Sequence, residues 1–149
     1  MENELYKIYS NLKSNQSIGI DGISKQKLDE IIDDEIAIIK RKIENNSYEF
    51  SFYKQKLLVK SINKTREISI PTLRDKIVLR YLFNEISNSF KDTLTTKLHA
   101  NMIISEVIEN RENFNAFIKV DIVNFFPSIN HEILLDKLKT KIFDENILN

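Results

Sequence analysis

The sequence predicts a mixed α+β fold in which helices dominate and one β-hairpin interrupts them. Apolar residues recur at helical spacing over several segments of the 149-residue chain. Between residues 48 and 70 the pattern changes to the β-branched and aromatic residues typical of strands. With only two Gly and two Pro, the chain is poorly suited to the many tight turns of a β-sandwich or barrel. We therefore expect helices with a small sheet.

The first part of the chain predicts two helices joined by a glycine-containing loop. Residues 2–14 and 25–45 both carry an apolar stripe at helical spacing, and the loop between them contains GIDGIS at 19–24. In the longer pattern acidic residues come early and basic residues late, an order that complements the helix dipole. Helix stability explains this charge order, so we assign the run no catalytic role.

A β-hairpin is predicted next, with residues 56–62 paired to 66–70 and a turn at 63–64. Lys60 and Arg66 would then lie near its tip.

Pro71 ends the second strand, and three further helices are predicted after it. Each has, at or just before its start, a polar residue whose side chain can cap the first turn. They are 72–90, with Thr72 followed by Asp75 at the capping position, 102–112 after Asn101, and 131–142 after Asn130.

A short apolar strand is predicted from Ala116 to Ile122, and Asp121 interrupts it near its end. A buried aspartate is uncommon unless it is paired or bound to metal, because removing a carboxylate from water is costly. The plainer alternative is an aspartate that caps a turn. The two aromatic residues that follow, Phe125 and Phe126, make this segment the most informative of the chain.

Composition excludes several kinds of site. The absence of Cys removes disulfides, cysteine zinc sites and thiol nucleophiles, and two isolated histidines, His99 and His131, do not make a metal site. Two glycines are too few for a glycine-rich phosphate cradle. Neither a signal peptide nor a stretch of 18 apolar residues is present. We therefore expect a cytoplasmic protein with no membrane partner.

Charge is distributed unevenly although 22 basic and 22 acidic residues cancel over the whole chain. Residues 54–80 hold eight basic residues against two acidic ones, a local net charge of +6. Such a run can be a solvated face or a surface for a polyanion. The basic residues are Lys54, Lys56, Lys60, Lys64, Arg66, Arg74, Lys76 and Arg80.

Two motifs, read together, resemble one enzyme family. Residues 66–78 read R-x-I-x-I-P-T-x-R-D-K-I-V, and residues 117–129 read F-x-x-x-D-I-x-x-F-F-x-S-I. With GIDGIS at 19–24 and the segment 48–52, they resemble bacterial reverse transcriptases of the group II intron, retron and abortive-infection or defence-associated lineage. The resemblance covers the whole chain in the family's order.

That resemblance implies an incomplete right-hand polymerase fold. Residues 1–115 would form the N-terminal extension and the helix-rich fingers with their β-hairpin, and residues 116–149 would begin the palm with its first strand. The implied activity is RNA-directed DNA polymerisation. RNA template, primer, dNTP and the remaining C-terminal palm and thumb would be the partners, with a possible role in anti-phage defence.

The family's first catalytic motif assigns roles to the residues around Asp121. Asp121 would be the catalytic, metal-binding aspartate, and the carbonyl of Ile122 a backbone ligand, for two Mg²⁺ ions in the complete enzyme, with Mn²⁺ possible. Phe126 would lie under the ribose and exclude a 2′-hydroxyl. Asn124 and Phe125 would present backbone N–H groups to the incoming triphosphate.

The resemblance also assigns roles to the basic stretch. Lys60 and Arg66 match the fingers residues that clamp the triphosphate in the intron enzymes, a role that suits an ammonium and a planar guanidinium. Four of the six remaining basic residues are expected to contact template phosphates or carboxylates within the domain. These are Lys54, Lys56, Arg74 and Arg80.

Two departures from the family pattern shape the expectation. The segment TTKLHANMI at 95–103 lacks glycine and fits the defence or retron-like branches better than a mobile intron enzyme. The Y-x-D-D hairpin with the other catalytic aspartates is not in these 149 residues, so the piece alone is expected to be inactive. Two alternatives stay open: a non-catalytic nucleic-acid-binding or partner-binding module, and a mixed helical domain whose basic stretch is only solvated.

Overall fold

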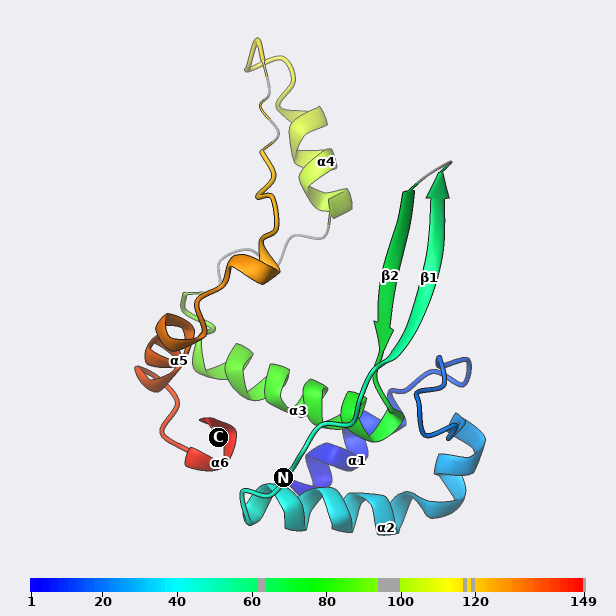
Figure 1. Ribbon diagram of the computed structural model, residues 1–149. Coiled ribbons are helices and arrows are strands. Elements are labelled where there is room, and N and C mark those ends of the chain that lie inside the picture. Colours follow the sequence, from blue (N-terminus) through cyan, green and yellow to red (C-terminus); the bar gives the residue numbers. More distant parts are fainter. Residues whose placement is uncertain (62–63, 94–99, 117, 119, 149) are drawn as a thin grey trace. The chain divides into compact units, whose positions relative to one another are not determined.

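The computed structural model describes residues 1–61, 64–93, 100–116, 118 and 120–148, and it confirms the mixed α+β class (Figure 1). The described part contains α-helices, one 3₁₀ turn and a two-stranded antiparallel sheet. None of its helices is long and apolar enough to cross a membrane. In chain order the elements are α1 (Glu2–Ser10), α2 (Lys25–Glu44), β1 (Lys54–Ser61), β2 (Lys64–Ile70), α3 (Leu73–Ser89), α4 (Ala100–Glu109), η1 (Phe126–Ser128), α5 (His131–Lys139) and α6 (Glu145–Leu148).

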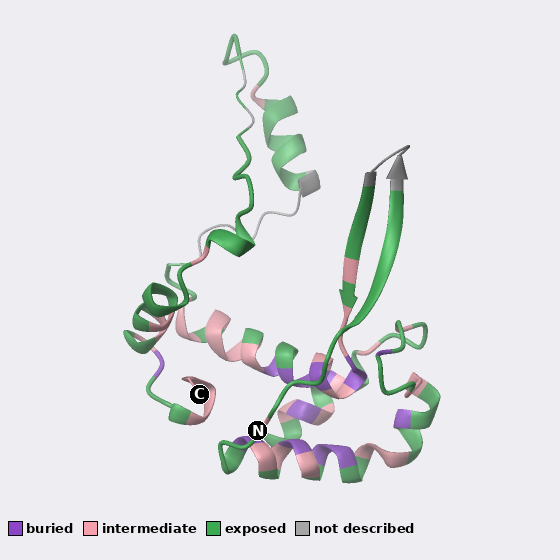
Figure 2. Cartoon of the chain, in the orientation of Figure 1, coloured by how far each residue is buried: buried purple, intermediate pink, exposed green. Residues whose placement is uncertain are grey.

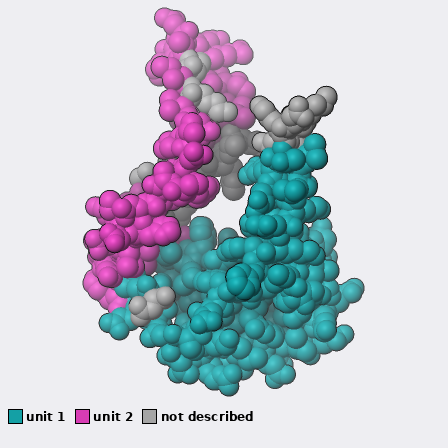
Figure 3. All heavy atoms as spheres, viewed as in Figure 1, with its two compact units in different colours: residues 1–86, 144–149 teal, residues 87–143 magenta. Residues whose placement is uncertain are grey.

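The chain divides into two compact units (Figure 3). Unit 1 comprises residues 1–86 and 144–149, and unit 2 comprises residues 87–143. Unit 1 therefore holds α1, α2, the hairpin, most of α3 and α6, and unit 2 holds α4, η1 and α5. The division predicted between residues 115 and 116 falls inside unit 2.

The core of unit 1 lies between α1, α2 and α3, where Figure 2 shows the buried residues gathered. Most of the buried positions lie three, four or eight residues apart along their helix, as expected for helices that pack along one face. Burying these apolar side chains supplies the main driving force for folding of the unit. They are Leu5 and Ile8 of α1, Leu28, Ile36, Ile39 and Ile43 of α2, and Leu73, Ile77, Val78 and Tyr81 of α3.

Helix α2 matches the predicted range closely, but its acidic residues are not placed to complement the dipole. The first turn holds no acidic residue, while Arg41 and Lys42 do lie in the last turn. The acids begin one turn later and make individual contacts instead. Asp29 accepts hydrogen bonds from Tyr9 and Lys25. The dipole explanation therefore holds only for the basic end.

The hairpin forms where the sequence predicts it, with β1 two residues longer at its start. Lys54 pairs with Ile70 and Leu58 with Arg66, and the register shifts between Val59 and Ser61. Lys64 pairs with Ser61 and so belongs to β2, whereas residue 63 of the predicted turn lies outside the described residues.

Two of the three predicted helix starts are confirmed by their caps. The hydroxyl of Thr72 accepts the backbone N–H of Asp75 at 3.1 Å. The side chain of Asn130 accepts the N–H of Ile133 at the same distance. The third is wrong, because α4 begins at Ala100 and Asn101 is already inside the helix, whereas a capping residue has a non-helical backbone.

The strand predicted from Ala116 to Ile122 is not formed by its described residues, 116, 118 and 120–122. A strand needs a neighbour to take up its backbone hydrogen bonds, and the hairpin is the one sheet in the described part of the chain. Ile118 is 89% exposed and Val120 is 81% exposed. The strand prediction is therefore wrong for these residues, since their apolar pattern has no strand partner in the described part of the chain.

Gly19 allows the loop before α2 to approach the start of α3 closely. A Cβ at this position would lie 2.7 Å from the Cα and 2.9 Å from the backbone nitrogen of Thr72. Gly19→Ala should therefore lower the free energy of unfolding by about 2 kcal/mol, in the range of overpacked sites. Urea unfolding followed by circular dichroism measures the change.

Gly22 provides the matched control for that substitution. Its φ of +71° is left-handed, but nothing lies within 4 Å of its Cβ position, and Asn adopts this backbone more readily than other residues. Gly22→Asn should thus cost less than Gly19→Ala. Equal costs would show that steric contact with Thr72 does not limit residue 19.

Candidate functional site

The strand register gathers the basic residues of the hairpin on one face. Because cross-strand partners lie on the same face and side chains alternate, the pairs Lys54↔Ile70, Lys56↔Ile68 and Leu58↔Arg66 share one side. This basic face therefore carries three cations and three aliphatic side chains. The one carboxylate of the two strands, Glu67, pairs with Leu57 on the other side.

The basic face is open to solvent. Lys54, Lys56 and Arg66 are exposed, and among the described strand residues only Ile68 and Ile70 are partly covered (Figure 2). Lys60 belongs to β1 at the register shift, but its side chain lies outside the described residues. Of the predicted Lys60–Arg66 pair, the structure therefore describes only the side chain of Arg66.

A cavity of about 420 Å³ lies at the base of this face. Lys54, Lys56 and Ile70 line it from the hairpin, and Gln16, Ser17 and Ile18 line it from the loop before α2, together with Gln55. No carboxylate is among these lining residues. A groove with two ammonium groups and an aliphatic floor suits a ligand that combines phosphates with flat apolar groups.

Lys76 holds the loop wall of that cavity in place. Its Nζ donates to the side-chain oxygen of Gln16 and to the carbonyl of Ser17, each at 3.1 Å. Burial lowers the pKa of Lys76 from its ordinary value. The ammonium of Lys76 is thus partly shielded from water, and it donates hydrogen bonds to residues of the same unit.

Arg74 was expected to contact either a template phosphate or a carboxylate within the domain, and the structure shows the contact with a carboxylate. Its Nη2 donates to Oε1 of Glu35 at 2.6 Å, and its Nε donates to Oε2 of the same carboxylate. The hydrogen bonds to Glu35 raise the pKa of Arg74. Arg80, in contrast, is exposed and lies 5.0 Å from the centre of the Phe83 ring.

A buried polar cluster that sequence reasoning missed lies beside this ion pair. Asp75 is 1% exposed, and one carboxylate oxygen accepts the hydroxyl of Tyr48 at 2.7 Å while the other accepts the backbone N–H of Ser51 at 3.1 Å. Burial and the bond to Asp75 raise the pKa of Tyr48. The one sequence signal was Asp75 at a capping position, which does not identify its partners.

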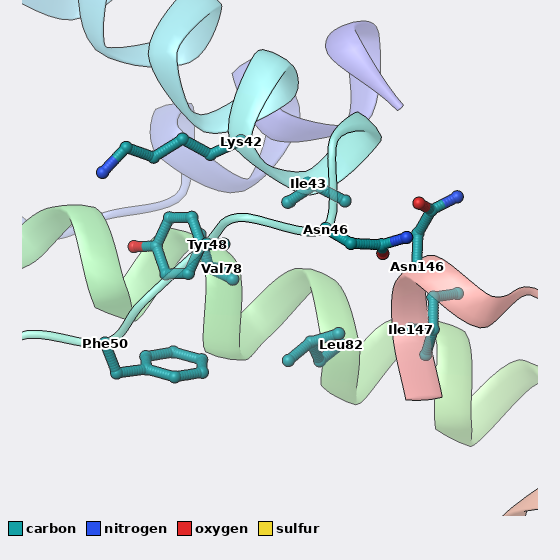
Figure 4. Close-up of a pocket in the computed structure, with 9 residues that line it drawn as sticks. All are labelled: Lys42, Ile43, Asn46, Tyr48, Phe50, Val78, Leu82, Asn146 and Ile147. Atoms are coloured by element: carbon teal, nitrogen blue, oxygen red, sulfur yellow. The ribbon is translucent and has the colours of Figure 1, made fainter. Parts of the chain in front are cut away.

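A second cavity, of about 80 Å³, lies next to Tyr48 (Figure 4). The segment between α2 and β1 contributes Tyr48 and Phe50, whose rings meet edge to face with centroids 5.3 Å apart. Binding sites for drug-sized ligands occupy several hundred Å³, so this one is a packing gap. The other lining residues are Lys42, Ile43, Asn46, Val78, Leu82, Asn146 and Ile147.

Asp121 lies in unit 2 and is exposed, as is Ile122. The described residues around Asp121 therefore do not form the predicted strand, and no strand lies beside them in the described part of the chain. One carboxylate and one adjacent carbonyl form only part of the donor set that Mg²⁺ takes from proteins, water and phosphate. Within the described residues no group of three or more His, Asp or Glu could hold a metal ion.

The residues after Asp121 form a compact turn. Asn124 has a φ of +54°, a left-handed backbone that Asn tolerates better than most residues. The 3₁₀ turn η1 follows, and Ser128 donates its backbone N–H to the carbonyl of Asn124 at 3.0 Å. Phe125 and Phe126 meet edge to face, with centroids 5.3 Å apart, and Phe126 is 79% exposed.

Comparison with known proteins adds one distant relative. The chain is 22% identical over 157 aligned residues to the protein named YkfC of Escherichia coli (strain K12). The alignment covers 97% of this chain and 41% of that protein, so the chain spans less than half the length of this relative. No protein-family model matches the chain.

Proposed function

We propose that the chain is the fingers and the first palm segment of an RNA-directed DNA polymerase of the bacterial reverse transcriptase type. The observation that carries the proposal is the hairpin register, which sets Lys54, Lys56 and Arg66 on one face, away from Glu67. A cationic face with interleaved aliphatic residues suits a phosphodiester backbone and a triphosphate. The two sequence motifs support the same assignment.

In this proposal the two units have different tasks. The hairpin of unit 1 binds phosphates, with Lys60 and Arg66 toward the dNTP and Lys54 and Lys56 toward the template. Arg80 is exposed and remains available to a template phosphate, whereas Arg74 is engaged by Glu35.

The segment after Asp121 contributes the chemistry and the choice of sugar. Asp121 and Ile122 would supply a carboxylate and a carbonyl to the Mg²⁺ ions, which in the complete enzyme polarise the reacting phosphate. Phe126 is the steric gate against a 2′-hydroxyl. Asn124 and Phe125 form the turn that precedes it. A second carboxylate-bearing strand must come from outside these 149 residues, so this piece alone should be inactive.

RNA binding by the chain itself tests the hairpin half of the proposal. The affinity for a fluorescein-labelled single-stranded RNA, measured by anisotropy, should fall steeply with salt. Lys54→Ala and Lys56→Ala should each reduce the slope of log K against log salt by about 0.7, the value for one phosphate contact on a single strand.

Lys27→Ala is the matched control for these lysine substitutions, because Lys27 is an exposed lysine on α2. It should leave the salt slope unchanged. A chain with no affinity for RNA at low salt, or hairpin variants that behave like Lys27→Ala, would contradict the proposal. RNA binding by a complete protein that incorporates no dNTP would instead favour the non-catalytic module.

A further inference from the structure

Among the described residues, the hairpin of unit 1 is covered by the rest of the unit only at its base. It extends away from α1, α2 and α3 (Figure 1), and the described residues of β1 from Lys54 to Val59 are all exposed. Beyond Ile68 and Ile70, which are partly covered, the described hairpin residues are exposed on both faces, so little along that length sets the direction of the hairpin. The contacts where the two strands leave the helices must therefore determine where the basic face points.

Both strands are attached to the first turn of α3. On one side, β2 continues through Pro71 and Thr72 directly into the helix, and Thr72 caps it. On the other side, the segment that leads into β1 is tied to the same turn by Asp75, which accepts from Tyr48 and from the backbone of Ser51. One carboxylate thus joins the lead-in of β1 to the turn where β2 ends.

The turn that carries both attachments is itself fixed to the helical core. Asp75 and Thr72 are buried, and Arg74 between them binds the carboxylate of Glu35 on α2. The described part of the chain has no buried side-chain polar atom without a hydrogen-bond partner. Satisfied buried polar groups of this kind specify one arrangement, because each alternative leaves a polar group unpaired.

We infer that Asp75 is a positioning residue that sets the direction of the hairpin, and with it the basic face, relative to the helices. The carboxylate does so through Tyr48 and Ser51 and need not touch any ligand. That Asp75 sets the direction of the hairpin is inferred from these contacts alone. That Asp75 also affects RNA binding rests on the proposed function.

A distance measurement tests the inference directly. The chain contains no Cys, so Leu57→Cys on the hairpin and Ala37→Cys on α2, both at exposed positions, can be spin-labelled specifically. Pulsed electron paramagnetic resonance should give one narrow distribution of the distance between the two spin labels when Asp75 is present. Asp75→Ala should broaden it while circular dichroism still shows folded helices.

Two further variants separate positioning from general stability. Asp75→Asn keeps an oxygen that can accept from Ser51 and gains an N–H that can donate to Tyr48, so it should restore a narrow distribution. Glu30→Ala removes an exposed carboxylate of α2 and should change nothing. A folded Asp75→Ala chain with an unbroadened distribution would overturn the inference.

Tyr48→Phe decides the question if Asp75→Ala does not fold. This variant removes only the hydroxyl bond and leaves the ring in place, so an intermediate broadening is expected. A distribution as narrow as that of the parent chain would overturn the inference in that case too.

RNA binding distinguishes a failure of the inference from a failure of the proposed function. Asp75→Ala keeps every cation of the basic face, so RNA affinity should fall several-fold with the salt slope unchanged, unlike in Lys54→Ala. If the parent chain binds no RNA, the proposed function fails while the distance distributions still test the role of Asp75.

Discussion

Replacing Arg74 by alanine should lower the free energy of unfolding of this protein by about 2 kcal/mol, which is less than for a fully buried ion pair, because the Arg74 side chain is one-third exposed. Glu35 is only 6% exposed, and both of its oxygens accept from the guanidinium of Arg74. Without Arg74 the buried carboxylate of Glu35 on α2 loses both of these hydrogen bonds, and an unpaired buried carboxylate is costly. Urea unfolding at neutral pH measures the loss.

Two further variants show whether the loss of stability in Arg74→Ala comes from the unpaired charge of Glu35. Replacing both partners, with Arg74→Met and Glu35→Leu together, should recover most of the stability, since paired apolar residues often replace buried ion pairs without loss. Arg80→Ala removes an exposed arginine of the same helix and should cost less than about 0.5 kcal/mol. Equal costs for Arg74→Ala and Arg80→Ala would show that the ion pair does not stabilise the fold.

The largest effect on activity is expected from Asp121→Asn in the longer polymerase to which we propose this segment belongs. Losing a metal-binding carboxylate should remove several kcal/mol of transition-state stabilisation, or about a thousandfold in rate. The measurement is incorporation of dNTP on an RNA template with Mg²⁺ present. RNA binding should change little, because Asp121 lies outside the hairpin.

Asp136→Asn is the control for that substitution, because Asp136 is an exposed carboxylate on α5 of the same unit. It should leave incorporation unchanged. Full activity in the Asp121→Asn protein would show that the metal assignment is wrong, whatever the outcome for RNA binding.

Features that depend on neighbouring residues were predictable from the sequence. The Thr72 and Asn130 caps reach only three residues along the chain. The hairpin follows from the strand-forming composition of two adjacent runs. The basic face also follows, because alternation along a strand sets the side of each residue once the register is known.

Features that depend on distant partners were not predictable. Arg74 and Glu35 are 39 residues apart, and Tyr48 and Asp75 are 27 apart. Nothing in the local pattern distinguishes Arg74, which is engaged inside the unit, from Arg80, which is exposed. The strand predicted at 116–122 is not formed by its described residues for the same reason, since a strand needs a hydrogen-bonding neighbour and the described part of the chain places none beside this segment.

The sequence by itself determined the helices, the hairpin and the cations that the hairpin carries, because these depend on propensity, capping and alternation over a few residues. Only the tertiary structure decided which charged groups are free to meet a ligand. Packing of α3 against α2 paired Arg74 with the buried carboxylate of Glu35 and made Asp75 the attachment of the hairpin. Buried polar groups must find partners wherever the fold brings them, and those partners lie far away in the sequence.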